Sequence, residues 1–228
     1  MRGDRPRGRF ITLEGGEGAG KSTQARLLGE RLLAAGVPVV LTREPGGTPA
    51  GERIRALLLA PGEAPITPQT EALLMTAARA EHVARVIEPA LDAGSWVISD
   101  RYVDSTFAYQ GGGRGLPLRH LQQAQELATH GLIPDLTLLL DLPVEIGLRR
   151  RMGAMEEPNR LDAEARTFHE SVRTSYHSLV AADRVRWHVV DATQEVDRIA
   201  AAIWQEMVRR FAAWLPLARD QIVSGTGT

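Results

Sequence analysis

Short runs of apolar residues alternate along the chain with longer segments in which apolar positions recur every three or four residues. Several of the short runs are apolar at almost every position, which is typical of strands that are covered on both faces of a parallel sheet. We therefore predict five β-strands, over residues 10–14, 37–43, 96–99, 136–141 and 186–191.

The longer segments predict helices. One spans 21–34 and stops before Gly36, and another begins at Thr67-Pro68, an N-cap residue followed by a proline in the first turn, and continues to residue 92. Further helices are predicted over 118–130, 144–152, 164–182 and 194–214. Strands separated by helices indicate an α/β fold, with a five-stranded parallel sheet and helices on both faces.

The predicted strands end in charged residues: Glu14, Arg43, Asp100 with Arg101, and Asp141. Ligands of doubly wound sheets bind beyond the carboxyl ends of the strands. The sequence therefore predicts a polar, phosphate-binding crevice at this edge of the sheet.

A glycine-rich loop follows the first strand, opens a helix and matches the P-loop pattern G-x-x-x-x-G-K-[ST]. It consists of Gly15, Gly16, Glu17, Gly18, Ala19, Gly20, Lys21, Ser22 and Thr23. Its N–H groups and the helix N-terminus are predicted to bind the phosphates of ATP, with Lys21 at the β- and γ-phosphates and Ser22 at Mg²⁺. Lys21 is the only lysine among 27 Lys and Arg residues, which favours this interpretation over a glycine-rich turn with a chance lysine.

Other motifs narrow the class of P-loop protein. A GTPase would need a second lysine in its guanine-binding motif, and a motor-type ATPase would have a glutamate where Leu142 follows Asp141. The remaining charged motifs are rich in arginine, which binds phosphate oxygens in pairs. Two unit charges of like sign at 4 Å repel by about 4 kcal/mol at an effective dielectric near 20, and arginines offset that repulsion. These features favour phosphoryl transfer to a second anionic substrate.

At the level of longer motifs the chain resembles the bacterial thymidylate kinases, a family of P-loop nucleoside monophosphate kinases. The resemblance rests on residues 10–23, on Thr-Arg-Glu-Pro-Gly-Gly-Thr at 42–48, on Asp-Arg-Tyr at 100–102, on Ala-Tyr-Gln-Gly at 108–111, and on Asn-Arg-Leu-Asp at 159–162 with Phe168, Arg173 and Tyr176. It covers roughly residues 9–214. The resemblance implies transfer of phosphate from ATP, with Mg²⁺, to dTMP, giving dTDP for dTTP synthesis.

The resemblance also implies roles for single residues. Arg43 and Arg101 would hold the acceptor phosphate, and Glu17 would face the 3′-hydroxyl and the transferring phosphate. The other implied substrate contacts are Arg79 at a thymine carbonyl, Ser105, Thr106 and Gln110 as polar contacts, and Tyr109 against the sugar. Glu14 and Asp100 would position Mg²⁺ with Ser22, and the residues implied to be catalytic are Lys21, Glu17, Arg101, Arg150 and Arg160.

Two segments depart from the family pattern. Met75 stands where many members have a phenylalanine stacked on thymine, which leaves open a looser base selectivity, or an ordinary core methionine. A lid over about 149–162 would close over ATP and supply Arg150 and Arg160, but it contains acidic residues and has Asn159 where an aspartate is usual.

Composition sets the remaining expectations. Residues 1–8 predict a disordered basic leader, 9–215 a single kinase domain and 216–228 a tail. No cysteine, a net charge of −1 and no long apolar stretch lead us to expect a cytoplasmic protein that binds neither nucleic acid nor membranes. The glycines at 111–113 predict a flexible connection, and no chemistry is assigned to His169 or His177. The family resemblance implies a homodimer.

Two other functions stay open. A kinase for another nucleoside monophosphate, or for a deoxynucleoside, would carry the same P-loop. A nucleotide-binding switch would bind ATP but release no ADP in response to an acceptor. The combination of Arg43, Asp100 and Arg101 argues against a switch.

Overall fold

The computed structural model describes residues 6–60, 66–153 and 164–215, and its centre is a five-stranded sheet. All strand pairs are parallel, in the order β2-β3-β1-β4-β5. The strands are β1 Phe10–Glu14, β2 Val39–Arg43, β3 Trp96–Asp100, β4 Leu136–Asp141 and β5 Trp187–Asp191. The predicted fold class is confirmed, and the strand bounds differ from the predicted ones by at most two residues.

Helices surround this sheet. The α-helices are α1 Lys21–Ala34, α2 Pro49–Leu59, α3 Pro68–His82, α4 Glu88–Asp92, α5 Val103–Thr106, α6 Leu118–Thr129, α7 Val144–Gly153, α8 Arg166–Ala182 and α9 Val196–Phe211. Two π-helical segments, η1 Val83–Ile87 and η2 Phe107–Gly113, and a 3₁₀ turn, η3 Ala212–Trp214, continue α3, α5 and α9.

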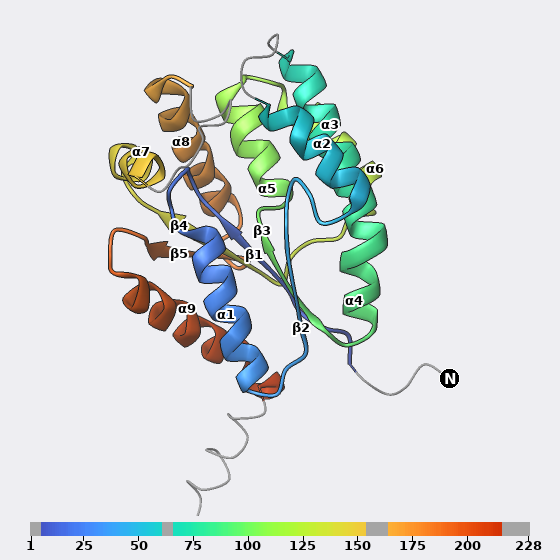
Figure 1. Ribbon diagram of the computed structural model, residues 1–228, viewed down its shortest axis with the longest axis vertical. Coiled ribbons are helices and arrows are strands. Elements are labelled where there is room, and N and C mark those ends of the chain that lie inside the picture. The colour runs from blue at the N-terminus through green and yellow to red at the C-terminus, as the bar shows by residue number, and fades with distance from the viewer. Residues whose placement is uncertain (1–5, 61–65, 154–163, 216–228) are drawn as a thin grey trace, which may run out of the picture.

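The two faces of the sheet are covered by different helices. Helices α1 and α9 lie side by side over one face (Figure 1), and Leu28 of α1 and Met207 of α9 share a buried cluster with Leu138 of β4. On the opposite face, α8 and η2 pack around Leu139, and η1 and α4 pack around Val97. Because both faces are buried, the central strands are apolar on both sides.

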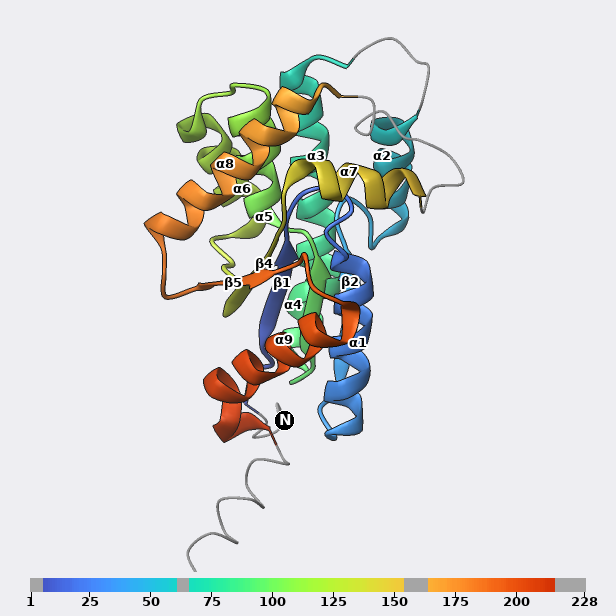
Figure 2. The same ribbon diagram turned by 90° about the vertical axis from the view of Figure 1, so that its left-hand side faces the viewer.

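The register of the sheet brings charged strand ends together. Asp100 pairs with Arg43 of β2 and with Leu13 of β1, so Glu14 and Arg101 emerge at the same edge. Figure 2 shows α7 crossing this end of the sheet, above the segment that joins β1 to α1. The strand ends that predicted a crevice are therefore neighbours in space.

The hydrophobic pattern does not predict α2. This helix buries only Gly51 and Leu58, so few of its positions face the core. Its start nevertheless carries the same signal as the start of α3: the side chain of Thr48 accepts a hydrogen bond from Gly51 N at 3.0 Å, and Pro49 stands in the first turn.

The segment 111–113, predicted to be a flexible connection, is part of η2. A Cβ added to Gly112 would lie 2.5 Å from a side-chain atom of Ser175, and one added to Gly113 would lie 2.4 Å from the ring of Phe168. The glycines allow η2 to pack closely against α8, so the prediction of a flexible connection is wrong.

The long helix predicted over 67–92 is continuous but not uniform. Helix α3 ends at His82, η1 widens the backbone to a π-helix, and α4 follows from Glu88. Pro89 stands in the first turn of α4, where its missing N–H cannot continue the α-helical hydrogen bonds. The other predicted helices lie within two residues of their predicted bounds, except that the last one divides into α9 and η3, and α5 and η2 are not predicted.

The described part of the chain is anchored from Gly8 onward. Gly8 is buried and its N–H donates to Leu91 O at 2.8 Å, and the guanidinium of Arg9 lies 4.2 Å from the ring centroid of Trp214. The predicted tail, 216–228, and most of the predicted lid lie outside the described residues. Within the described ranges, no helix has both the length and the apolar character needed to cross a membrane.

Candidate functional site

A cavity of about 430 Å³ lies beyond the carboxyl ends of β2 and β3, against the P-loop that follows β1. Residues 17–23 of the P-loop form one wall, and side chains from β2, α3, α5 and η2 form another. The predicted substrate-binding residues all line it, namely Arg43, Met75, Arg79, Arg101, Ser105, Thr106, Tyr109 and Gln110. The cavity therefore joins a phosphate-binding loop to an arginine-rich wall.

Lys21 is buried at the start of α1. Its Nζ donates to Gly15 O at 3.2 Å and to Gly16 O at 2.7 Å, so the ammonium lies within the P-loop. Burial, followed by the charge of Arg101, lowers the pKa of Lys21 to about 8. Gly20, directly before it, has φ 86° and forms the N-cap of α1 without a side chain, which leaves the helix N-terminus open to an anion.

Helix α7 lies against the P-loop through two glycines. A Cβ at Gly18 would lie 2.0 Å from Gly147 O, and a Cβ at Gly147 would lie 2.4 Å from Glu17 O. This close approach brings Arg150 and Arg151, on the next turn of α7, to the cavity wall. Arg150 donates to the carbonyl oxygens of residues 192 and 193 at 2.6 and 3.1 Å, so it bridges α7 and the turn after β5.

Arg101 directly follows β3 and has a left-handed backbone with φ 74°. Its Nη2 donates to Glu17 Oε1 at 2.8 Å and to Tyr109 OH at 2.9 Å, and its Nη1 donates to Ser105 Oγ at 3.1 Å. Tyr109 OH in turn donates to Glu17 Oε1 at 2.7 Å. Burial alone would raise the pKa of Glu17, but Arg101 and Lys21 overcome it and hold that pKa at about 2.

Glu14 has no exposed surface and is not among the residues that line the cavity. Its Oε1 accepts from Tyr102 N at 2.8 Å, and its Oε2 accepts from Ser105 Oγ at 2.6 Å and Tyr176 OH at 2.8 Å. Burial, and then the charge of Asp104, raises the pKa of Glu14 to about 7. This geometry favours a structural role behind Arg101 over the predicted role at Mg²⁺.

The other two predicted metal ligands are close together. Ser22 Oγ donates a short hydrogen bond to Asp100 Oδ2, and both residues line the cavity. A hydroxyl and a carboxylate are hard oxygen ligands, and Mg²⁺ at phosphates uses one or two such groups and completes its shell with water and phosphate oxygens. The pair fits this ion, although the described residues hold no cluster of three or more His, Cys, Asp or Glu side chains arranged to bind a metal.

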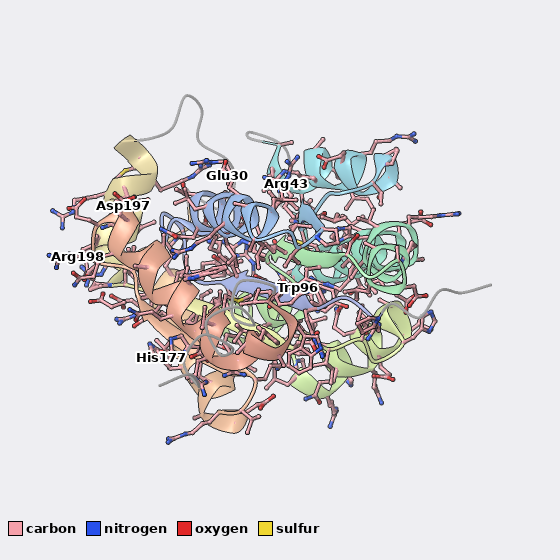
Figure 3. All side chains as sticks on the ribbon, turned by 90° about the horizontal axis from the view of Figure 1, so that it is seen from below. Glu30, Arg43, Trp96, His177, Asp197 and Arg198 are labelled. Atoms are coloured by element: carbon pink, nitrogen blue, oxygen red, sulfur yellow. The ribbon has the colours of Figure 1, made fainter. Side chains whose placement is uncertain are left out.

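At the outer side of the cavity, one arginine contacts α2 and a second belongs to it. Arg43 Nη2 donates to both carboxylate oxygens of Glu52 at 3.1 and 3.0 Å, and Figure 3 shows Arg43 beside α2. Arg55, one turn further along α2, donates to Pro45 O at 3.0 Å and lines the same cavity. Burial, and then the positive charge of Arg43, lowers the pKa of Arg55. An anion bound between the two guanidinium groups would offset this repulsion.

Arg79 is buried, with 2% of its surface exposed. Its Nε donates to Glu44 Oε2 at 2.7 Å, its Nη1 to Thr106 Oγ1 at 2.9 Å and Gln125 Oε1 at 2.5 Å, and its Nη2 to Tyr102 O at 2.9 Å. Four of its five N–H groups thus donate to described residues, two of them in the loops after β2 and β3 and two in α5 and α6. The guanidinium is therefore fixed at the cavity wall, and the four hydrogen bonds to described residues leave one N–H of Nη2 for a ligand.

Gln110 and Met75 lie near Arg79 on the cavity wall. Gln110 is buried, and its Nε2 donates to Glu71 Oε1 at 2.8 Å. Arg114 donates to the same Glu71 carboxylate at 3.3 and 3.2 Å. Met75 is half-buried and contributes an apolar surface.

The comparison with protein families shows to which family the chain belongs. The family described as "Thymidylate kinase" matches residues 13–203, which include the P-loop and every described residue named above as lining the cavity. The chain belongs to the thymidylate kinase family. Three proteins named Thymidylate kinase illustrate the similarity. The one from Thermomicrobium roseum is 57% identical over 195 residues, 86% of this chain and 92% of that protein.

The other two cover similar shares. The protein from Pseudomonas fluorescens is 53% identical over 196 residues, 86% of this chain and 93% of its own length. The one from Alkalilimnicola ehrlichii is 48% identical over 209 residues, 92% of this chain and 96% of its own length. Identity at this level over nearly the whole chain confirms the resemblance found in the sequence motifs.

Some residues of this thymidylate kinase family site are not found by sequence reasoning. Arg55, Glu44 and Arg151 all line the cavity. The signal for Arg55 was present, because Thr48-Pro49 marks the start of the helix that carries it. Arg160, predicted to be a lid arginine, lies outside the described residues.

Proposed function

We propose that this protein transfers the γ-phosphoryl group of ATP to dTMP, giving dTDP and ADP. The observation that carries the proposal is that the P-loop lines one wall of a cavity, and Arg43, Arg55 and Arg101 line another wall of the same cavity. Such a cavity suits two anionic substrates side by side. Membership of the thymidylate kinase family supports dTMP as the acceptor.

In the proposed mechanism ATP binds with its phosphates on the P-loop and Lys21, and the acceptor phosphate is held by Arg43 and Arg101. An anionic oxygen of dTMP attacks the γ-phosphorus. The bond from that phosphorus to the β–γ bridging oxygen breaks, and ADP leaves with the electron pair. The attacking oxygen is already ionised, so no general base is needed, and catalysis depends on positioning and charge neutralisation.

We propose Ser22 and Asp100 as the protein ligands of Mg²⁺, because their oxygens are adjacent at the start of α1. When bound there with ATP, the ion supplies positive charge to the β- and γ-phosphates. Without the ion, Asp100 accepts a hydrogen bond from the Ser22 hydroxyl, which holds the two side chains in place. Glu14 is left out of this set because hydrogen bonds occupy both of its oxygens.

The base and sugar of dTMP are proposed to bind at the wall formed by α3 and η2. Arg79, with one N–H beyond its four bonds, suits a single carbonyl acceptor of the base. Thr106 and Gln110 provide polar groups beside it, and Met75 an apolar face for the ring. Glu17, ionised at neutral pH, can accept a hydrogen bond from the 3′-hydroxyl of the sugar. Tyr109 is held against Glu17, and we propose that its ring occupies the space that the 2′-hydroxyl of a ribose would need.

Three further features remain part of the proposal. Arg150 and Arg160 are proposed to act at the phosphates of ATP when the segment around 149–162 closes, and Arg150 already lines the cavity. The family resemblance also supports a homodimer and a cytoplasmic location.

The acceptor decides between this proposal and its alternatives. Release of ADP should be measured by a coupled assay with dTMP, dUMP, dCMP, dAMP, dGMP and thymidine, using Lys21→Ala as the inactive control. We expect kcat/KM for dTMP to exceed that of every other acceptor by at least about tenfold, with dUMP second, because a missing methyl group changes discrimination only modestly.

Each other result has a definite meaning. Preference for a different monophosphate or for thymidine would assign the protein to another kinase activity. Binding of ATP without acceptor-stimulated release of ADP would make it a nucleotide-binding switch. Full activity of Lys21→Ala would remove the P-loop from the mechanism.

A further inference from the structure

A buried polar chain connects β2 to Arg79 through the last residue of α3. That residue, His82, has no exposed surface. Its Nδ1 lies 2.9 Å from Glu44 Oε1, and its Nε2 lies 2.6 Å from Thr42 Oγ1. A carboxylate can only accept, so Nδ1 donates to Glu44, while Nε2 shares the second hydrogen bond with the hydroxyl of Thr42.

The same carboxylate holds Arg79. Glu44 Oε2 accepts from Arg79 Nε at 2.7 Å, while Oε1 is bound by His82. All three side chains are at least 95% buried. Loss of the imidazole donor would leave Oε1 of the buried Glu44 carboxylate without the hydrogen bond from His82, and Glu44 would turn to regain a donor. That movement would shift the guanidinium of Arg79.

The loop between β2 and α2 is fitted to the His82 ring. A Cβ at Gly47 would lie 2.6 Å from ring atoms Cδ2 and Nε2, so the loop backbone packs directly on the imidazole. Thr42, in β2 just before this loop, directly precedes Arg43. The π-helical segment η1 begins one residue after His82, and such segments occur frequently at functional sites. His82 thus contacts the segment that carries both Arg43 and Glu44.

We propose that His82 is a positioning residue for the acceptor nucleotide: through Glu44 it fixes the orientation of the Arg79 guanidinium. His82 does not itself line the cavity, so its effect is indirect. The inference rests on the proposed function, in which Arg79 contacts the base of dTMP.

Three substitutions separate the two hydrogen bonds of the ring. Asparagine places an amide donor near the position of Nδ1 and keeps the bond to Glu44, whereas glutamine reaches the position of Nε2 and loses it. Phenylalanine keeps the ring but removes both bonds. We expect His82→Phe and His82→Gln to raise KM for dTMP about tenfold, the effect of one lost bond to a buried charged group. His82→Asn should stay within about threefold of the unchanged protein.

Two further readouts distinguish positioning from general damage. The kcat and the KM for ATP should stay within about threefold in all three variants, since the P-loop lies on the other wall of the cavity. The asparagine and glutamine variants should unfold at similar temperatures, because each loses one of the two hydrogen bonds. If His82→Phe does not fold, the comparison of asparagine with glutamine decides alone. Equal KM values for dTMP in these two variants would overturn the proposal.

A double variant tests whether His82 acts through Arg79. Arg79→Met alone should raise KM for dTMP at least tenfold, and adding His82→Phe or His82→Gln should raise it less than about twofold further, because both changes disturb one guanidinium. Multiplied effects in the double variant would overturn the role of His82 while leaving that of Arg79 intact. An unchanged KM in Arg79→Met would overturn the proposed base contact, and the His82 inference with it.

Discussion

At the scale of single residues, the centre of the site is a cation whose position is fixed before substrates arrive. Arg101 adopts φ 74°, a conformation that costs a non-glycine residue about 1–2 kcal/mol. Hydrogen bonds from its backbone N–H to Leu13 O at 3.0 Å and from its side chain to Glu17 and Tyr109 offset this cost. The guanidinium is therefore held at the cavity wall before a phosphate binds.

Glu14, which supports Arg101 from behind through Ser105, should make stability depend on pH. Its raised pKa of about 7 means that the folded state binds a proton more tightly than the unfolded state. This stabilisation is complete below the unfolded pKa near 4.5 and is lost as pH rises to 7. Glu14→Gln should remove up to about 3 kcal/mol of this dependence, measured by urea unfolding between pH 4.5 and 7.5.

An exposed glutamate provides the matched control. Glu81→Gln makes the same chemical change on the solvent-exposed side of α3, where 48% of the side chain is accessible, and should leave the pH dependence as it is. Parallel stability curves for Glu14→Gln and the unchanged protein would show that the buried carboxyl does not carry this proton.

At the scale of elements, α2 contributes to the site more than its two buried residues suggest. It places Glu52 against Arg43 and Arg55 at the cavity wall, yet buries only Gly51 and Leu58. A helix held by so little packing depends on its N-cap. The geometry at the acceptor phosphate should therefore respond to changes at the start of α2.

Thr48→Ala removes that cap. The change should lower the free energy of unfolding by about 1 kcal/mol, and raise KM for dTMP about threefold as the first turn of α2 loosens. Thermal unfolding and initial-rate kinetics measure the two effects. Glu52, one turn from the cap, transmits the change to Arg43.

The cap of α3 serves as the control. Thr67 accepts a hydrogen bond from Thr70 N at 3.2 Å in the same arrangement, with a proline at the next position. Thr67→Ala should cost similar stability but leave KM for dTMP unchanged, because Arg79 lies more than three turns away and is held by four bonds of its own. Equal KM changes in the two variants would contradict a specific role for α2.

The helical segments also show how far the sequence predicts elements. The strands, α1 and α6 are predicted from apolar runs, helical spacing and clear stop signals such as Gly36 and Gly131. Helix α2 is missed because it buries only Gly51 and Leu58, so few apolar positions mark the side that faces the core. The glycines at 112 and 113 were misread because close packing and flexibility both use residues without a side chain, and only the position of α8 distinguishes them.

At the scale of the whole molecule, the proposed homodimer has a candidate surface. Helices α3 and α6 pack against each other, and each exposes a leucine: Leu73 is 64% and Leu127 79% exposed. We expect sedimentation equilibrium to give the mass of two chains. Leu127→Glu should raise the dimer dissociation constant at least tenfold, because a charge would be buried in an apolar contact.

Val185 offers a control outside these helices. It is 84% exposed, in the turn before β5, and Val185→Glu should leave the dimer intact. A monomeric protein at all concentrations tested would contradict the homodimer. A dimer that Leu127→Glu does not weaken would place the contact on another surface.

The sequence by itself determined the chemistry that depends on neighbours along the chain. The P-loop is one strand, one loop and one helix start, so contiguous residues fix its backbone N–H groups and the position of Lys21. The alternation of strands and helices likewise determined the fold class, and the motif order indicated the family.

Only the tertiary structure decided how side chains from distant segments are paired. Arg79 on a helix has the pattern of a solvated residue, yet it is buried with partners from the loop after β2, the loop after β3, α5 and α6. Glu14 ends a strand, as Asp100 does, but the Glu14 side chain does not line the cavity, and burial raises its pKa. Burial and charge pairing depend on packing between residues far apart in sequence, which local pattern does not specify.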